Sequence, residues 1–229
     1  MKNAIVSFAN STNYYINGLA RLNESLRLNF DGDFLGFIGE NTIGAPPHWQ
    51  NPYAFKIYAI QKALEAGYTK ILWLDSSVFA IKPVQPIFDE IGKDGFIFQD
   101  SGHWLGHWTS DRVLDYHGIT RDSAMEIRMI GNAGFLGLDY DNEQARQFFS
   151  RWKKSMQDGM FTGSWTNEGS TESQDPRCRG HRHDMSNSSA IIYNMGLLPL
   201  MKHGEQWLQY AGPYDQTKNE TIILKAQGL

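Results

Sequence analysis

Residues 70–77 read KILWLDSS, a run of strand-forming residues that ends abruptly in one acidic residue and two serines. After its lysine, the segment 70–74 is apolar on both faces, which is typical of a strand at the centre of a sheet covered on both sides. A carboxylate directly after such a strand is held by rigid backbone, so Asp75 is predicted to face a ligand crevice. On this motif alone, Asp75 could instead cap a turn or a helix.

On either side of this stretch, short apolar runs alternate with segments of helical periodicity. Strands are expected at 4–8, 34–38, 95–99 and 130–138, and helices at 14–28, 53–66, 83–90, 142–157 and 185–195. Irregular segments are expected at 44–52, 100–117 and 161–182. Asp184 or Ser186 is expected to cap the last helix. The alternation predicts one α/β domain over 1–229 with a mostly parallel sheet, although the chain could be one part of a longer protein.

The composition excludes several classes of protein. There are 21 Lys and Arg against 25 Asp and Glu, and no basic run, which argues against nucleic-acid binding. No stretch approaches the roughly 20 apolar residues of a transmembrane helix. Cys178 is the only cysteine, which rules out an intrachain disulfide and favours a reducing, cytoplasmic location. The 13% aromatic content suits stacking on sugar rings or bases, and packing in the core explains it equally well.

Motif order and spacing over residues 4–195 resemble those of the GT-A glycosyltransferases. In that family a helix leads into a strand that ends in an Asp-x-Asp motif, as 53–67 leads here into 70–77. The resemblance implies a GT-A-like three-layer α/β/α sandwich in which ligands bind beyond the carboxyl ends of the strands. It also implies that the segment 75–77 (Asp75, Ser76 and Ser77) faces the diphosphate of a nucleotide-sugar, with Lys56 sharing the phosphate role.

The same resemblance implies a divalent cation, Mn²⁺ or Mg²⁺, at the diphosphate. Its expected ligands are Asp75 and, late in the chain, His203. The second acidic position of the family motif is Ser77 here. Because one carboxylate and one hydroxyl bind a cation more weakly than two carboxylates do, this departure leaves open whether transfer needs a metal.

Two further segments resemble donor-binding parts of these enzymes. Residues 132–134 read Asn-Ala-Gly, and the resemblance places Asn132 and Gly134 along the donor sugar. A glycine-containing strand or bulge is the alternative explanation. The loop after the first strand is expected to border the nucleotide base, through the residues Ser7, Ala9 and Asn10.

A late segment, 180–186, reads GHRHDMS and resembles the start of a late helix in several glycosyltransferase-like proteins. By this resemblance Asp184 lies near the anomeric carbon, either as a general base or as a polar group that stabilises an oxocarbenium-like centre. His183 is a candidate for donor or metal contact. Many family members have Gln where Met185 stands, so the sequence does not decide between inversion and retention.

Taken together, the resemblance implies a hexosyltransferase that moves a hexose from a nucleotide-sugar, expected to be UDP-linked, to a glycan hydroxyl. Trp104, Trp108 and Trp165 could form sugar platforms on the acceptor side, or could simply pack a covering loop. One alternative is a sugar nucleotidyltransferase, but 7–11 lacks the glycine-rich basic loop expected there. The other is a non-catalytic carbohydrate-binding module, which would use the aromatic residues without Asp75.

Overall fold

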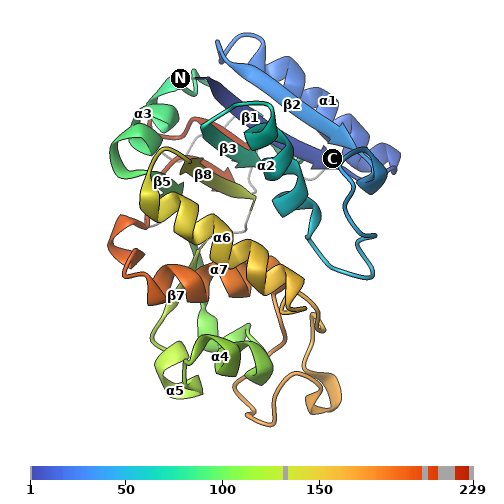
Figure 1. The fold of residues 1–229 in the computed structure, drawn as a ribbon, viewed down its shortest axis with the longest axis vertical. Coiled ribbons are helices and arrows are strands. Elements are labelled where there is room, and N and C mark those ends of the chain that lie inside the picture. The colour runs from blue at the N-terminus through green and yellow to red at the C-terminus, as the bar shows by residue number, and fades with distance from the viewer. Residues whose placement is uncertain (1, 131–133, 203–205, 211–219, 227–229) are drawn as a thin grey trace.

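A five-stranded sheet in the order β2-β1-β3-β8-β5 forms the centre of the molecule (Figure 1). The computed structural model describes residues 2–130, 134–202, 206–210 and 220–226. The strands are β1 (Asn3–Ala9), β2 (Asp33–Ile38), β3 (Lys70–Leu74), β5 (Phe96–Phe98) and β8 (Phe135–Asp139). β1 runs parallel to both β2 and β3, whereas β8 is antiparallel to both β3 and β5. All strands of this sheet except β8 therefore point the same way, and the expected mostly parallel sheet is confirmed.

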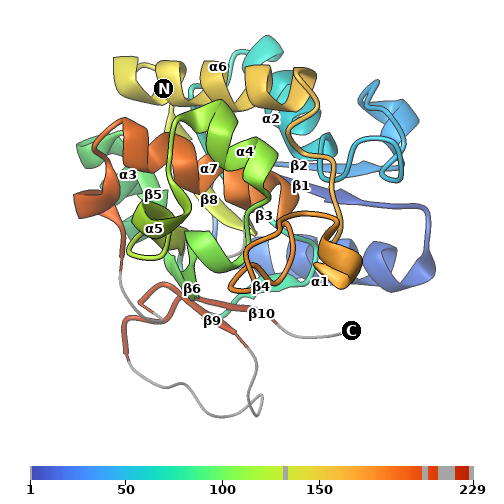
Figure 2. The ribbon, with the colours of Figure 1, turned by 90° about the horizontal axis from the view of Figure 1, so that it is seen from below.

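Helices cover both faces of the sheet and produce three layers (Figure 2). One face carries α2 (Phe55–Glu65) and α6 (Glu143–Gln157), with α7 (His183–Asn194) packed against α6, and the other carries α1 (Asn13–Leu26) and α3 (Gln85–Asp94). The side chains of β3 divide between the layers. Ile71 and Trp73 join the core beneath α2 and α6, and Leu72 and Leu74 join the opposite core. Burial on both sides is the reason this strand carries no polar residue after Lys70.

Shorter elements extend the sheet region at its ends. A second sheet has the order β4-β10-β9, from Val78–Ala80, Leu224–Ala226 and Leu208–Tyr210, and brings the late chain beside the end of β3. A third pairing joins β6 (Asp100–Trp104) to β7 (Arg128–Ile130). Among the described helices, none combines the length and apolar character that a membrane span requires.

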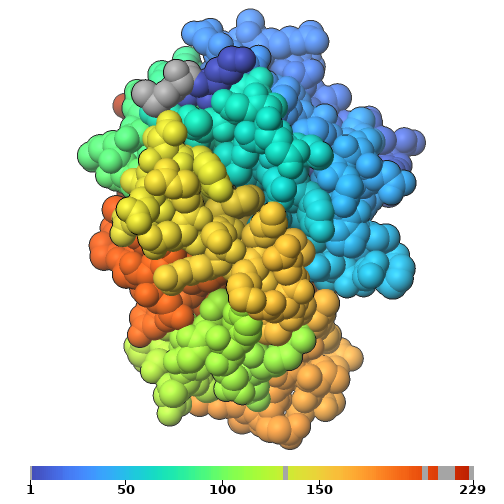
Figure 3. Space-filling view, viewed as in Figure 1, coloured from blue at the N-terminus to red at the C-terminus, as the bar shows by residue number. Residues whose placement is uncertain are grey.

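The end of the molecule below the sheet in Figure 1 is built from segments expected to be irregular. The segment 100–117 contains β6, the 3-10 helix Leu105–His107 and α4 (Asp111–His117), and α5 (Arg121–Ala124) follows. The prediction of an irregular segment was wrong there because β6 is defined by its distant partner β7, which local sequence does not reveal. The segment 161–182 is irregular apart from a 3-10 turn at Glu168–Ser170, as predicted. In the space-filling view its orange surface adjoins the green surface of 105–125 (Figure 3).

The start of α7 differs from the sequence prediction. The helix begins at His183, whose φ is +48°, and the N-cap position is held by Arg182 without a side-chain hydrogen bond. The predicted capping roles of Asp184 and Ser186 are therefore wrong. The Asp184 carboxylate pairs instead with Lys56, and the Ser186 hydroxyl donates to the Trp108 carbonyl at 2.6 Å. The expected strand 130–138 likewise divides into β7 and β8.

Candidate active site

Three charged side chains meet where β3, α2 and α7 approach one another. Asp75 directly follows β3, Lys56 lies in the first turn of α2, and Asp184 lies in the first turn of α7. The Lys56 Nζ atom is 3.0 Å from Oδ2 of Asp184 and 3.5 Å from Oδ1 of Asp75. The two carboxylates that the sequence singles out therefore share one site, and a lysine bridges them.

The backbone and neighbouring rings hold this cluster in place. The Asp75 N–H donates to the Gly134 carbonyl at 3.0 Å, and the Trp73 indole N–H donates to Asp75 Oδ1 at 2.9 Å. The Lys56 Nζ atom lies 5.1 Å from the ring centre of Tyr53 and 5.8 Å from that of Trp73, within range of cation–π attraction. Tyr53 has a φ of +60°, an uncommon conformation for a non-glycine residue and one that is found often at functional sites.

Burial and the neighbouring charges together set the charge state of the cluster. Lys56 is 2% exposed and Asp184 is 3% exposed, whereas the Asp75 side chain is 36% exposed. Burial by itself lowers the pKa of Lys56, but Asp184 and Asp75 outweigh it and raise that pKa, so the lysine is an ammonium at neutral pH. Burial raises the pKa of Asp184, and the Lys56 ammonium opposes this. Asp75 is thus the more exposed carboxylate of the pair, and both carboxylates line the smaller cavity.

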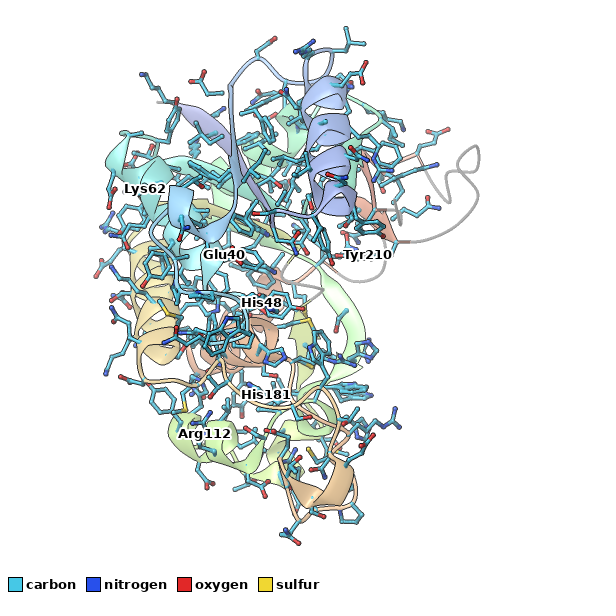
Figure 4. All side chains as sticks on the ribbon, turned by 90° about the vertical axis from the view of Figure 1, so that its right-hand side faces the viewer. Glu40, His48, Lys62, Arg112, His181 and Tyr210 are labelled. Carbon is cyan, nitrogen blue, oxygen red and sulfur yellow. The ribbon has the colours of Figure 1, made fainter. Side chains whose placement is uncertain are left out.

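Two cavities meet at this cluster. The larger has a volume of about 740 Å³ and is lined mainly by aromatic and polar side chains, namely Phe8, Asn10, Tyr14, Tyr15, Glu40, His48, Tyr53, Phe55, Asp75, Ser76, Ser77, Tyr210 and Ala226. Three of these residues, Glu40, His48 and Tyr210, are labelled in Figure 4 and come from segments far apart in the chain. The smaller has a volume of about 320 Å³ and is lined by Tyr53, Lys56, Asp75, His103, Trp165, Arg182, Asp184 and Met185. Tyr53 and Asp75 line both cavities and therefore mark their junction.

Some of the predicted donor-binding residues line the larger cavity, and others are buried behind it. Asn10, Ser76 and Ser77 line the larger cavity. Ser7 and Ala9 are buried in β1 and line neither cavity. Neither residue therefore exposes a surface for the predicted contact with a nucleotide base. The wall at this strand is formed by their neighbours Phe8 and Asn10.

The other predicted residues have supporting or undefined positions. Gly134 is buried and contributes its carbonyl to the Asp75 backbone. Asn132 and His203 lie outside the described residues. The His183 ring is nearly buried, with Nδ1 2.8 Å from the Phe161 carbonyl, and packs beside Tyr53 and Trp165. His183 therefore supports the wall of the smaller cavity.

Of the residues that line the smaller cavity, Tyr53 and Arg182 are not identified by sequence reasoning. Tyr53 joins the cavities, and its positive φ has no sequence signal. Arg182 lies between two conspicuous histidines, but nothing in the sequence shows that its guanidinium carbon lies 3.9 Å from the ring centre of Trp108 and 4.2 Å from that of Trp165. For the aromatic wall of the larger cavity, the adjacent Tyr14 and Tyr15 after the first strand were a usable signal.

The buried histidines beside the site make stability depend on pH. Burial lowers the pKa of His183 from 6.5 to about 4, so its folded form stays neutral where an unfolded histidine takes up a proton. The stability from this neutral ring is fully present above pH 6.5 and is lost as pH falls toward 4. We expect the free energy of unfolding of His183→Gln to decrease less as pH falls from 6.5 to 4, by at most about 3 kcal/mol at 1.36 kcal/mol for each pKa unit. Urea unfolding at several pH values measures this free energy. The same dependence on pH in the variant and the unmodified chain would contradict the prediction.

The sheet order, the three layers and a carboxylate at the end of the central strand beside a two-part cavity define a GT-A-like fold. No family model matches the sequence, and no curated protein is similar to it. Among solved structures, mouse xyloside xylosyltransferase 1 superposes with a TM-score of 0.53 at 10% identity, over 99% of this chain and 97% of that one. The bifunctional glycosyltransferase WbbM gives 0.52 at 12% identity, over 99% of this chain and 45% of that one. An active-site mutant of LgtC gives 0.50 at 11% identity, over 98% and 86%.

These likenesses confirm the GT-A-like glycosyltransferase fold expected from the motifs. The chain spans less than half of the WbbM chain, so only part of that bifunctional protein corresponds to it. At identities this low, the shared property is the fold. The activity of this chain must therefore be argued from its own site.

Proposed function

We propose that this chain transfers a sugar from a nucleoside-diphosphate sugar to a hydroxyl group of a glycan acceptor. The observation that carries the proposal is the Lys56 bridge between Asp75 and Asp184 at the junction of two cavities. The larger, aromatic cavity suits a nucleoside, and the smaller, polar one suits the transferred sugar and the acceptor. A pocket with a few convergent polar groups of perturbed pKa is the expected form of an active site.

The donor would lie across the junction. Its base would stack on aromatic side chains of the larger cavity, which offers Tyr14, Tyr15 and Tyr53 among others. Its diphosphate would face the segment 75–77, and its sugar would reach into the smaller cavity toward Asp184. A UDP-linked hexose is the donor we propose, which makes the chain a hexosyltransferase.

In the reaction, the bond between the anomeric carbon and the diphosphate oxygen breaks, and a new bond forms to the acceptor oxygen. The acceptor hydroxyl loses its proton, and the nucleoside diphosphate leaves with additional negative charge. We place Asp184 as the residue nearest the reacting carbon, where its carboxylate accepts that proton or stabilises positive charge on the sugar ring. The buried Lys56 ammonium orients both carboxylates and is close enough to the junction to stabilise the departing diphosphate.

A divalent cation, Mn²⁺ or Mg²⁺, belongs to the proposal as a partner of the donor. Among the described residues, no group of three His, Cys, Asp or Glu side chains could hold a metal ion. Asp75 and Ser77 line the cavity wall together and fit a cation that takes its remaining ligands from a diphosphate, as Mg²⁺ often does. When bound, such a cation would neutralise charge on the leaving diphosphate.

Nucleotide binding gives the direct test. We expect UDP at a hundredfold excess over its dissociation constant to raise the free energy of unfolding by about 2.7 kcal/mol, because only the folded chain has the cavity. Thermal unfolding with UDP, ADP, GDP and CDP, each with and without Mn²⁺, measures this effect. Incubation with UDP-hexoses should then release UDP slowly even without an acceptor.

The two alternative functions predict different results, the second of them in an assay with a nucleoside triphosphate and a sugar phosphate. A carbohydrate-binding module would show no shift with any nucleotide and no release of UDP. A sugar nucleotidyltransferase would produce pyrophosphate from a nucleoside triphosphate and a sugar phosphate. Either outcome would overturn the proposed transfer.

A further inference from the structure

The smaller cavity contains an arginine that the proposed transfer does not use. Arg182 lies at the N-cap of α7, and its guanidinium rests against the indole rings of Trp108 and Trp165. Stacking on indoles occupies the flat faces of a guanidinium and leaves its N–H edge for hydrogen bonding. Arg182 lines the cavity, so a ligand in that cavity can reach this edge.

This guanidinium has no anionic partner among residues 2–130, 134–202, 206–210 and 220–226. Three other arginines of the same end of the molecule, Arg121, Arg128 and Arg177, each pair with an aspartate at 3.0 Å or less. For Arg182 no ion pair and no side-chain hydrogen bond is formed within the described residues. Burial lowers its pKa, and the opposing influence comes from Tyr53 and not from a carboxylate. A partly buried cation without a partner is costly unless a ligand supplies one.

The other side chains of the smaller cavity leave Arg182 unneutralised. His103 lines the same cavity, and burial first, then the charges of Arg182, Arg128 and Arg179, lower the pKa of its ring, so it is neutral at neutral pH. The carboxylates of the cavity, Asp75 and Asp184, are both held by Lys56. Among the described residues that line this cavity, Arg182 is therefore the cation that no carboxylate holds.

Arg182 is also held rigidly. Its backbone N–H donates to the Trp108 carbonyl at 3.0 Å, which ties the start of α7 to the residue on which its side chain stacks. Gly180 has a φ of +154°, and a Cβ atom there would lie 2.1 Å from the Trp165 carbonyl oxygen. Only glycine permits this approach, which places Trp165 against the guanidinium. A cation positioned in advance in this way loses little entropy when it binds a ligand.

The position of Arg182 indicates which substrate it contacts. Every described residue of the larger cavity comes from 8–77 or from 210 and 226, whereas His103, Trp165 and Arg182 line only the smaller one. The proposed diphosphate position, 75–77, lies on the larger cavity and borders the smaller one only at Asp75. Arg182 therefore faces the cavity that receives the transferred sugar and the acceptor, and not the one that receives the nucleoside.

We propose that Arg182 binds a carboxylate or phosphate group of the acceptor, so that the acceptor is an acidic sugar. The proposal rests on the proposed function, because it assumes that the smaller cavity receives the acceptor. Both oxyanions present a pair of oxygens that match the N–H edge of a stacked guanidinium.

Binding measured without any donor tests the proposal. The ligands are methyl β-D-glucuronide, glucose 6-phosphate and, as the neutral control, methyl β-D-glucoside, and calorimetry reports each affinity. We expect at least one acidic ligand to bind about tenfold or more tightly than the glucoside, a difference that shrinks in high salt. Which acid binds identifies the oxyanion. Equal binding of all three ligands would overturn the proposal.

Variants assign the effect to the guanidinium. Arg182→Gln should reduce the affinity for the acidic ligand to that for the glucoside, and Arg182→Lys, which keeps the charge without the planar edge, should fall between. Arg151→Gln, an exposed arginine on α6, is the matched control and should bind like the unmodified chain. Thermal unfolding confirms that each variant is folded. Unchanged acid binding in Arg182→Gln would overturn the assignment.

A parallel titration with UDP separates the two proposals. We expect Arg182→Gln to bind UDP as tightly as the unmodified chain, and a matching loss of UDP affinity would show that Arg182 serves the donor instead. If the unmodified chain binds an acidic sugar but no nucleotide, the proposed transfer fails while the oxyanion site stands. If it binds UDP but no acidic sugar, the acceptor assignment fails alone.

Discussion

Asp184→Asn should lower the rate of sugar transfer by about 10²–10⁴-fold, the usual contribution of a positioned acid–base group. Asparagine keeps the shape of the side chain but removes the charge and the basicity that we assign to the residue nearest the reacting carbon. The binding of UDP should be nearly unchanged, because Asp184 lines the smaller cavity and not the larger one. Steady-state kinetics for release of UDP and for transfer to an acceptor, with UDP affinity measured by calorimetry, separate the two effects.

The control for this variant is Asp115→Asn, an exposed aspartate of α4 that lies away from both cavities. It should transfer sugar at the rate of the unmodified chain. Turnover in Asp184→Asn within about twofold of that rate, a difference below about 0.4 kcal/mol, would remove Asp184 from the mechanism.

The sequence alone predicts that Ala at either Asp75 or Asp184 abolishes transfer and leaves the fold intact. Burial changes the choice of experiment for one of them. Asp75 is partly exposed, so its replacement by Ala is a reasonable test, whereas Asp184 is paired with Lys56 in the interior. Removing the Asp184 side chain would leave a cavity and a less compensated ammonium, and asparagine avoids the cavity.

Lys56→Met should destabilise the chain by about 3–5 kcal/mol, the usual cost of removing one partner from a buried ion pair. Methionine fills a similar volume but leaves Asp184, which is 3% exposed, without its ammonium. The loss should shrink as pH falls, because protonated Asp184 needs no partner in the interior. Urea unfolding at neutral and acidic pH measures both effects, and transfer should be lost as well.

The double variant Lys56→Met/Asp184→Asn distinguishes a buried ion pair from ordinary packing. Because neither charge remains, it should recover part of the lost stability and yet stay inactive, which gives a coupling energy of about 0.5–3 kcal/mol for the pair. Strictly additive losses would contradict the pairing in the folded chain. Recovery of activity together with stability would contradict the assigned roles.

Much of the fold was predictable because its signals are local. The run 70–74 is apolar at each position after its lysine because both of its faces are buried, and α6 shows its buried stripe in Phe148, Phe149 and Trp152. The segment 100–117 was not predictable, since β6 depends on pairing with β7. The start of α7 was predicted two residues late because Asp184 has a typical capping side chain that turns to Lys56 instead.

The candidate site was predictable in its carboxylates and, through the family resemblance, in Lys56, but not in Arg182. Asp75 stands out because it ends a buried strand, and Asp184 because of the motif around it. Lys56 reads locally as an exposed residue of an amphipathic helix, and only its 2% exposure shows that it is a buried partner. Arg182 shows no function until its stacking on Trp108 and Trp165 is seen.

The sequence by itself determined that a buried strand carries an acidic residue to the edge of an α/β sheet, since burial on two faces requires an apolar side chain at each position after Lys70. Only the tertiary structure decided that Lys56 joins Asp75 to Asp184, that Tyr53 lies at the junction of two cavities, and that Arg182 faces the smaller one. Charges and rings interact over a few ångströms in space, and these side chains are distant in the chain, so no local pattern encodes their meeting.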